Sequence, residues 1–230
     1  MGARAEDLVR SALAGTGLDV VGSAGVAAYD ARAPEAYRSA VLLDGARGLI
    51  VVGSAGPTLW RRLRERMDPE PARWGEPHPL DRFVRSLLDR ADAALAGAGV
   101  RFRRFEAAFD AEPRMPFATL AQIAGLGSPG PFGMLIHPVH GAWWALRGSY
   151  LVDTEVADAP RSRPACEGCA APCVGGWHNA EGVPRATVEA RSRCVVGQAS
   201  RYDDDQIAYH YDRMVILERL RRGAAPTGSR

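Results

Sequence analysis

The sequence contains no lysine, and all 29 of its basic residues are arginine. A Walker-type phosphate loop needs a Gly-Lys pair, and a Schiff base with pyridoxal phosphate or a carbonyl substrate needs a lysine amine. Both mechanisms are therefore excluded. Any chemistry must rely on carboxylates, histidine, cysteine, arginine, backbone groups or a bound cofactor.

Long apolar runs and an excess of one charge are also missing. The N-terminal stretch MGARAEDLVRSALAG lacks the apolar segment of a secretory signal, and no uninterrupted apolar run is long enough to cross a bilayer. The 29 arginines are scattered among 27 acidic residues, which leaves a formal net charge of +2. We therefore expect a soluble, cytoplasmic protein that binds neither nucleic acid nor a membrane.

The chain is long enough for one well-buried core and short for two, because 47% of its 230 residues are hydrophobic. We expect a single domain over residues 1–222 and a disordered tail at 223–230. Residues 157–201 are rich in Pro, Gly, Ser and Arg with little periodicity, so they are predicted to form a long loop.

Hydrophobic periodicity predicts helices and strands that follow one another along the chain. Helices are expected at 5–14, 58–67, 80–95 and 117–127, and after Asp203, whose spacing to Gln206 is typical of a capping box. Strands are expected at 18–24, 48–56 (buried on both faces) and 100–109. FGMLIH and AWWALRGSYLV should form an antiparallel hairpin around residues 138–141. The predicted fold class is α+β, a mixed sheet with flanking helices.

Alternation along the second hairpin strand separates two faces. The core face should carry Trp144, Leu146, Tyr150 and Val152, and the other face should carry Trp143, Ala145, Arg147 and Ser149. An aromatic plate beside a fixed cation suits a large flat ligand with anionic groups. Alternatively, Trp143 covers a helix while Arg147 extends to solvent, and His137 and His140 are hydrogen-bonded turn residues rather than ligands.

The segment FGMLIHPVHGAWWALRGSYLVDTEVADAP closely resembles the signature of the cobalamin trafficking and processing proteins of the cblC type. GSAGPTLWRRL, HPLDRFVRSLLDRA, LAQ and RYDDDQIAYHY extend this resemblance, in the same order, from about residue 48 to 213. FDAEPRMPFATLAQIAGLG and the later CEGC, PCVGG and SRC resemble epoxyqueuosine reductase, another cobalamin enzyme. Both resemblances imply corrinoid binding and a nitroreductase-like fold.

The cblC-type resemblance implies a cobalamin pocket lined by Thr119, Leu120, Ala121, Gln122, Phe132, Gly133, Leu135 and Leu146. It also implies that glutathione is bound by Arg147, Arg193 and, less directly, Arg213. The reductase resemblance places Asp110 near a proton-donating aspartate beside cobalt. A solvated loop aspartate is an equal alternative for Asp110.

All four cysteines lie within 29 residues, as Cys166, Cys169, Cys173 and Cys194, with His178 as a further candidate ligand. Such a concentration in a cytoplasmic chain favours an iron-sulfur cluster or zinc over disulfides. The alternative is a set of reduced, redox-active thiols.

These resemblances imply that the chain binds cobalamin and removes its upper axial ligand. The removal would be a reductive decyanation with electrons from FMN or FAD, or a dealkylation by a thiol such as glutathione. One alternative is a non-catalytic carrier that hands cobalamin to a cobalamin-dependent acceptor enzyme. Another is a reductase that uses both cobalamin and an iron-sulfur cluster.

Overall fold

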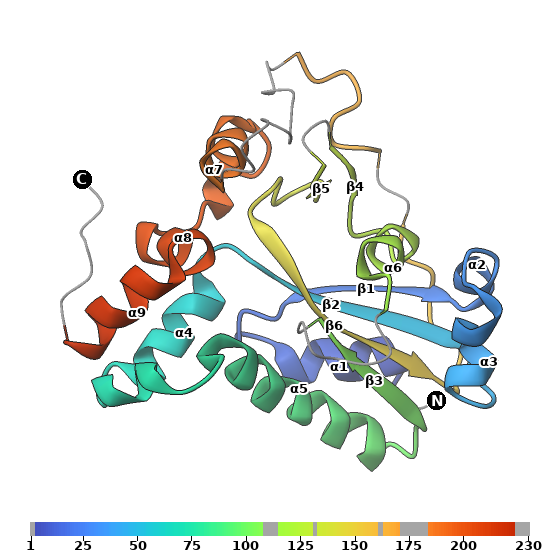
Figure 1. Cartoon of the computed structure of the whole chain (residues 1–230). Coiled ribbons are helices and arrows are strands. Elements are labelled where there is room, and N and C mark those ends of the chain that lie inside the picture. Colours follow the sequence, from blue (N-terminus) through green and yellow to red (C-terminus); the bar gives the residue numbers. More distant parts are fainter. Residues whose placement is uncertain (1–2, 108–114, 131–132, 161–162, 171–183, 224–230) are drawn as a thin grey trace.

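The computed structural model describes residues 3–107, 115–130, 133–160, 163–170 and 184–223. Four strands form one antiparallel sheet in the order β1-β2-β6-β3 (Figure 1). The strands are β1 (Val20–Gly25), β2 (Gly48–Ala55), β3 (Phe102–Glu106) and β6 (Trp144–Val152). A separate two-stranded sheet pairs β4 (Ser128–Pro129) with β5 (Leu135–Ile136). The α+β class is confirmed, but all described strand pairs are antiparallel, whereas a mixed sheet was expected.

Helices cover both faces of the main sheet (Figure 1). The first core lies between the sheet and α1 (Ala5–Leu13), α4 (Thr58–Met67), α5 (Pro79–Gly97), α8 (Asp204–Tyr211) and α9 (Arg213–Arg221). The second core lies on the opposite face, under α2 (Ala27–Asp30), α3 (Ser39–Leu42) and α6 (Phe117–Ile123). The remaining helices are η1 (Glu35–Tyr37), η2 (Pro71–Gly75), α7 (Pro184–Arg193) and η3 (Gln198–Ser200). No helix in the described ranges is long and apolar enough to span a bilayer.

Strand β2 is central because it pairs with β1 on one side and β6 on the other. Ile50 and Val52 enter the first core, while Leu49 and Val51 enter the second. This confirms the prediction of a strand buried on both faces. Helix α5 is confirmed as well, since Val84, Leu88, Ala91 and Leu95, spaced three or four residues apart, are buried in the first core.

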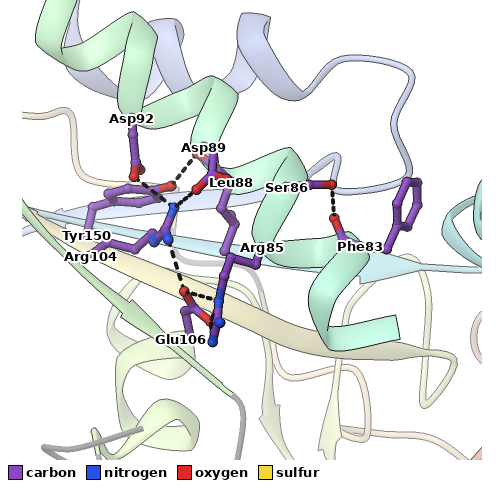
Figure 2. Close-up of polar contacts among 9 residues, drawn as sticks. All are labelled: Phe83, Arg85, Ser86, Leu88, Asp89, Asp92, Arg104, Glu106 and Tyr150. Atoms are coloured by element: carbon purple, nitrogen blue, oxygen red, sulfur yellow. Dashed lines mark hydrogen bonds and ion pairs between the residues drawn. The ribbon is translucent and has the colours of Figure 1, made fainter. Parts of the chain in front are cut away.

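A polar network fixes α5 on the sheet (Figure 2). The guanidinium of Arg104 on β3 lies 2.8 Å from Asp89, 2.7 Å from Asp92 and 3.0 Å from Glu106. On β6, Tyr150 donates its hydroxyl to the Leu88 carbonyl of α5 at 3.2 Å. Burial raises the pKa of Asp92, against the opposing effect of Arg104. One helix is thereby connected to two adjacent strands.

The predicted hairpin is not a paired ladder. Between its two arms the structure has one isolated bridge, His137–Gly141, and β5 pairs with β4 instead. Both edges of β6 are paired only over Gly148–Val152, with β2 and with β3, whereas Trp144–Leu146 pair with β2. At this end the contact with β5 is made by a side chain, because the Trp144 indole donates to the Leu135 carbonyl at 2.9 Å.

The predicted loop 157–201 contains structure that its composition does not reveal. Its start follows the edge of β1, where Ser23 donates its hydroxyl to the Ala157 carbonyl at 2.7 Å and accepts at its own carbonyl from the Ala159 amide. Its end contains α7 and η3. Residues 171–183 and the tail at 224–230 lie outside the described residues.

The predicted C-terminal helix is divided at Asp212, whose φ of −130° is not helical. The cap at its start is confirmed, because the Asp203 carboxylate accepts the Gln206 amide at 2.8 Å. The sequence pattern predicts one apolar face that carries Ile207, Tyr211, Met214, Val215 and Leu217. Beyond the break Leu217 is buried as expected, but Met214 and Val215 are 80% and 72% exposed. Ile216 and Leu220 are buried with Leu217, because the break changes which face of the helix meets the core.

Asp205 joins α8 to α4 and α9. Its carboxylate accepts from Arg64 at 2.7 Å and also bonds Arg219. The side chains of Asp205 and Arg64 are 5% and 14% exposed. A buried carboxylate between two guanidinium groups is a structural joint, because its removal takes away the carboxylate partner of Arg219 and leaves Arg64 with Asp68 alone among the described residues.

Substitution Asp205→Asn is expected to lower the free energy of unfolding by about 2 kcal/mol, since two partly buried arginines lose their shared carboxylate. Urea denaturation at neutral pH measures this change. Asp204→Asn is the matched control because Asp204 pairs with Arg201 on the surface, with its side chain 53% exposed. Equal midpoints for the two variants would show that the joint contributes nothing.

Candidate functional site

Arg147 occupies an irregularity in the central strand pair. Val52 pairs with Gly148 and the next β2 residue, Gly53, pairs with Leu146, so Arg147 is an extra residue in β6. A bulge of this kind reverses the facing of the residues beyond it. Trp144 and Leu146 accordingly pack with the second core, and Tyr150 and Val152 lie in the first core. The prediction that these four residues share one face is therefore wrong.

The bulge directs the guanidinium of Arg147 toward the helices of the first core. Arg147 and Leu146 line a cleft of about 20 Å³ together with Asp81 and Val84 of α5 and Glu106 of β3. Arg147 donates from Nε to the Ser54 hydroxyl at 2.9 Å, while its Nη2 is buried and has no hydrogen-bond partner within the described part of the chain. Burial lowers the pKa of Arg147 from its usual value. An enclosed cation with an unused donor suits an acceptor from a ligand or water.

Trp143 is fully buried, which corrects the expectation of an aromatic plate open to a ligand. Its ring is covered by Arg191, 4.8 Å from the ring centroid, and contacts Tyr202 edge-on. Arg191 is also 4.8 Å from the Tyr202 ring and donates from two nitrogens to the Ala142 carbonyl at 3.1 and 2.7 Å. The alternative that Trp143 packs under other elements is the better description.

Three further buried polar atoms have no hydrogen-bond partner among the described residues: Trp143 Nε1, the Tyr202 hydroxyl and, on α8, Gln206 Oε1. Together with Arg147 Nη2, these atoms comprise two N–H donors, one hydroxyl and one amide oxygen that can only accept. Buried polar groups in folded proteins are almost always satisfied, and each exception needs an explanation. We call Trp143, Arg147, Arg191, Tyr202 and Gln206 the arginine–aromatic cluster.

His210 adjoins the cluster, 5.7 Å from Tyr202 between ring centroids. Desolvation and then the guanidinium groups of Arg147, Arg191 and Arg213 lower the pKa of His210 to about 3. Part of the residue is open to solvent, so the three cations are the firmer reason for the direction of this shift. Because His210 is neutral, the positive charge of this region comes from the arginines alone.

The three arginines implied for glutathione are placed differently. Arg147 and Arg213 both act on His210, and Arg213 lies 5.1 Å from the Tyr209 ring. Arg193 is exposed at the end of α7. Sequence reasoning did not identify Arg191, which lies two positions earlier. Residues two positions apart in a helix lie on nearly opposite faces. If 184–193 is a helix, Arg191 and Arg193 therefore cannot both face inward, and this was the signal that could have pointed to Arg191.

A second cavity, of about 170 Å³, lies between α6, the β4–β5 sheet and residues 163–165. Gln122 and Ile136 line it. Among the other residues implied for cobalamin, Leu120 and Ala121 are fully buried in the second core, and Leu135 and Leu146 pack against that core. Thr119 is half-buried and Gly133 is exposed. Phe132 and Asp110 lie outside the described residues.

The turn after β5 is held by its own histidines. His137 Nδ1 accepts the amides of Val139 and His140 at 3.1 and 3.2 Å, and His140 Nδ1 lies 2.8 Å from the Ser200 hydroxyl. This supports the interpretation of both as hydrogen-bonded turn residues. Gly141 and Gly197 meet here at positive φ, and a Cβ on Gly141 would lie 1.8 Å from the Val196 carbonyl. The turn and the start of η3 therefore touch backbone to backbone.

The cysteines do not assemble a metal site among the described residues, where no three potential ligands come together. Cys194 is 5% exposed in a small apolar cluster with Ile136 and Ala142, and Cys166 packs against the same cluster. Cys169 is exposed. Cys173 and His178 lie within 171–183, outside the described residues.

Burial and then the neighbouring His140 lower the pKa of His137 to about 4, from the ordinary value of 6.5. The unfolded chain binds the proton more readily, so the stabilisation from neutral His137 is complete above pH 6.5 and falls as the pH drops toward 4. We expect a loss of about 1–2 kcal/mol across this window, reduced by partial solvent access.

Urea unfolding measured between about pH 7 and about pH 4.5 tests this expectation. In His137→Gln the free energy of unfolding should depend less on pH. His78→Asn is the control, because His78 is on the surface and Asn tolerates its left-handed backbone. An unchanged pH profile in His137→Gln would contradict the assignment.

Comparison with known proteins gives structural matches alone: no protein-family model and no curated protein sequence matches the chain. The structure of CblC from C. elegans, a B12-trafficking protein and homologue of human MMACHC, aligns with a TM-score of 0.69 at 13% identity. The alignment covers 98% of this chain and 97% of that one.

Epoxyqueuosine reductase is also similar. One crystal structure aligns with a TM-score of 0.52, and the B. subtilis enzyme with 0.50, both at 16% identity. Each alignment covers 72% of this chain and 49% of the reductase, so this chain corresponds to about half of the enzyme. The resemblances drawn from sequence motifs are confirmed at the level of the fold: the chain has the nitroreductase-like α+β fold that it shares with CblC over nearly its whole length.

Proposed function

We propose that this chain binds a cobalamin as its substrate and assists removal of the upper axial ligand with a thiol. The observation that carries the proposal is the correspondence to a B12-trafficking protein over 98% of this chain. A match of that extent includes the elements that frame the site: α6, β5, β6 and α8.

The cavity at Gln122 suits one part of a corrinoid. Its lining combines the Gln122 amide and the Ser128 hydroxyl with Ile136, Pro138 and Pro164. Apolar walls with a few polar groups are typical of small-molecule sites, but these have volumes of roughly 300–1,000 Å³. At about 170 Å³ the described cavity would hold an edge of the ring and its amide side chains rather than the whole molecule.

The arginine–aromatic cluster suits one carboxylate of the thiol, because the cleft at Arg147 is about 20 Å³ and would hold a group of that size rather than the whole molecule. Glutathione carries two carboxylates, and each can accept from a guanidinium or an indole N–H. Arg147 Nη2 and Trp143 Nε1 are unused donors, and Arg191 is held firmly by Ala142 and Tyr211. The cation that binds the ligand is then Arg147, while Arg191 keeps Trp143 and Tyr202 in position.

The chemistry of the transfer belongs to the corrinoid, whose cobalt gives up its upper ligand to the thiol or after reduction. The contribution of the chain is to bind and orient. Arg147 would fix a carboxylate of the thiol and limit its orientations. His210 stays neutral at physiological pH because its pKa is about 3, so it adds no charge to the site. A flavin such as FMN or FAD is the proposed electron donor for decyanation.

Two alternatives make different predictions for the same protein. A carrier would bind a corrinoid, leave the upper ligand in place and pass it to a cobalamin-dependent acceptor enzyme. A cobalamin and iron-sulfur reductase would need a cluster, and the described residues include Cys166, Cys169 and Cys194 but no group of three assembled ligands. The dealkylase is favoured because the unused buried donors call for an anionic second ligand.

Visible spectra of the purified protein with aquocobalamin, cyanocobalamin and methylcobalamin test the function directly. We expect a saturable spectral change on binding, and conversion of methylcobalamin to the dealkylated form when glutathione is added. Binding with an unchanged cobalt spectrum in the presence of thiol would indicate the carrier. The absence of any spectral change with all three corrinoids would contradict the proposal.

Substitution Arg147→Gln is expected to raise the KM for glutathione about 10-fold or more, because a hydrogen bond to a charged group is lost. Corrinoid affinity should change little, since Arg147 lies outside the cavity at Gln122. Arg193→Gln, at an exposed position, is expected to have a much smaller effect on the same KM. Equal losses of thiol and corrinoid binding in Arg147→Gln would contradict the role of Arg147.

A further inference from the structure

A cavity of about 230 Å³ lies between α4, η2 and the start of α5. It belongs to the first-core side of the sheet, whereas the cavity at Gln122 lies on the α6 side. Along α5 its lining residues Pro79, Arg82, Phe83 and Ser86 make one stripe, and the residues facing Arg147 make another. The two sites are therefore separated by the helix itself.

The floor of this cavity is apolar and its rim is cationic. The accessible part of the floor is the half-buried Phe83, behind which Leu63 and Met67 of α4 are 0% and 3% exposed. Figure 2 shows Phe83 and Ser86 on the part of α5 away from the Arg104 network, where Ser86 donates to the Phe83 carbonyl at 2.7 Å. A flat or aliphatic group of modest size could cover this floor.

Three arginines form the rim: Arg66, Arg73 and Arg82. The lone carboxylate among the lining residues, Glu76, is shared between Arg73 at 3.2 Å and Arg82 at 3.5 Å. Arg66 has no ion pair within the described residues and lies with its guanidinium carbon 5.9 Å from the Phe83 ring centroid. The lining thus carries two positive charges more than negative ones, next to an apolar floor.

The backbone at the cavity mouth is unusual. His78 is the one non-glycine residue in the described ranges with a positive φ, 48°, and it immediately precedes Pro79 at the first position of α5. Non-glycine residues in this conformation are strained and tend to occur near ligand sites. The strain lets the 19-residue helix begin at the cavity wall, where its N-terminal amides add positive potential.

We infer that this cavity binds a dianionic phosphate monoester, with the phosphate on Arg66 and Arg82 and a small apolar group over the Phe83 ring. The charge of the ligand matches that of the cavity, because a dianion balances the two excess positive charges of the lining residues. Arginine also pairs with phosphate through two parallel hydrogen bonds, which a monoester leaves available. The site is independent of the proposed cobalamin function.

Calorimetric titration of the whole chain with phenyl phosphate and with inorganic phosphate tests the inference. We expect saturable binding of phenyl phosphate at millimolar or lower concentration and weaker binding of inorganic phosphate, which cannot use the apolar floor. No saturable heat with phenyl phosphate would overturn it. Equal affinity for the two would also overturn it, because the floor would then contribute nothing.

Variants separate the site from general attraction to a basic surface. Arg66→Gln and Arg82→Gln should each weaken phenyl phosphate binding about 10-fold, since each removes a charged hydrogen bond. Arg62→Gln is the matched control, because Arg62 lies on the same helix, is exposed and pairs with Glu65. Losses as large in Arg62→Gln, or none in the other two, would refute the site. Thermal melting of each variant confirms that it is folded.

Discussion

The structure depends on one extra residue in the strand pair β2–β6. Without this extra residue, the side chains of β6 would alternate regularly, and Arg147 would share a face with Trp143, Ala145 and Ser149. With it, Trp144 and Leu146 serve the second core, Tyr150 and Val152 serve the first, and the guanidinium of Arg147 is carried toward α5 and α8. A bulge in a central strand is thereby the device that brings a charged group into an otherwise apolar layer.

This arrangement is costly for the folded protein. A buried donor or acceptor without a partner costs about 1–3 kcal/mol, and four such atoms gather on Trp143, Arg147, Tyr202 and Gln206. The surrounding structure maintains them: Arg191 binds the Ala142 carbonyl and stacks on two rings, and Asp205 joins α8 to α4 and α9. Rigid neighbours of this kind keep unused donors aimed at a ligand, which is how binding sites are preorganised.

Much of this fold could be predicted from the sequence where one residue pattern decides the outcome. The buried strand β2, the long helix α5 and the Asp203 cap all follow from local periodicity or side-chain chemistry. The absence of the hairpin could not be predicted, because β5 pairs with β4 and meets β6 through the Trp144 side chain instead of a backbone ladder. The bulge could not be predicted either, because the alternation of residues in the sequence of β6 does not indicate an extra residue.

The same limit applies to the site. Alternation left open whether Trp143 faces a ligand or packs under a helix, because it describes one strand, while the residues that cover Trp143, Arg191 and Tyr202, come from a segment about 50 residues later. The motif resemblance to cblC-type proteins identified Arg147 through its neighbours in the chain, and it could not indicate that Arg191 rather than Arg193 would turn inward. Local pattern identified the strand that carries the site, and tertiary packing determined which side chains complete it.

The central claim is that the unused donors beside Arg147 receive the thiol. The indole N–H of Trp143 reports on this, because Trp74 and Trp144 already donate to Asp68 and to the Leu135 carbonyl, while Trp143 has no hydrogen-bond partner in the ranges that the structure describes. Proton–nitrogen spectra of the indole groups, with Trp143→Phe used for assignment, should show a saturable shift of the Trp143 signal when glutathione is added to the corrinoid-loaded protein. A Trp143 signal that stays unchanged while the thiol removes the upper ligand would contradict the account.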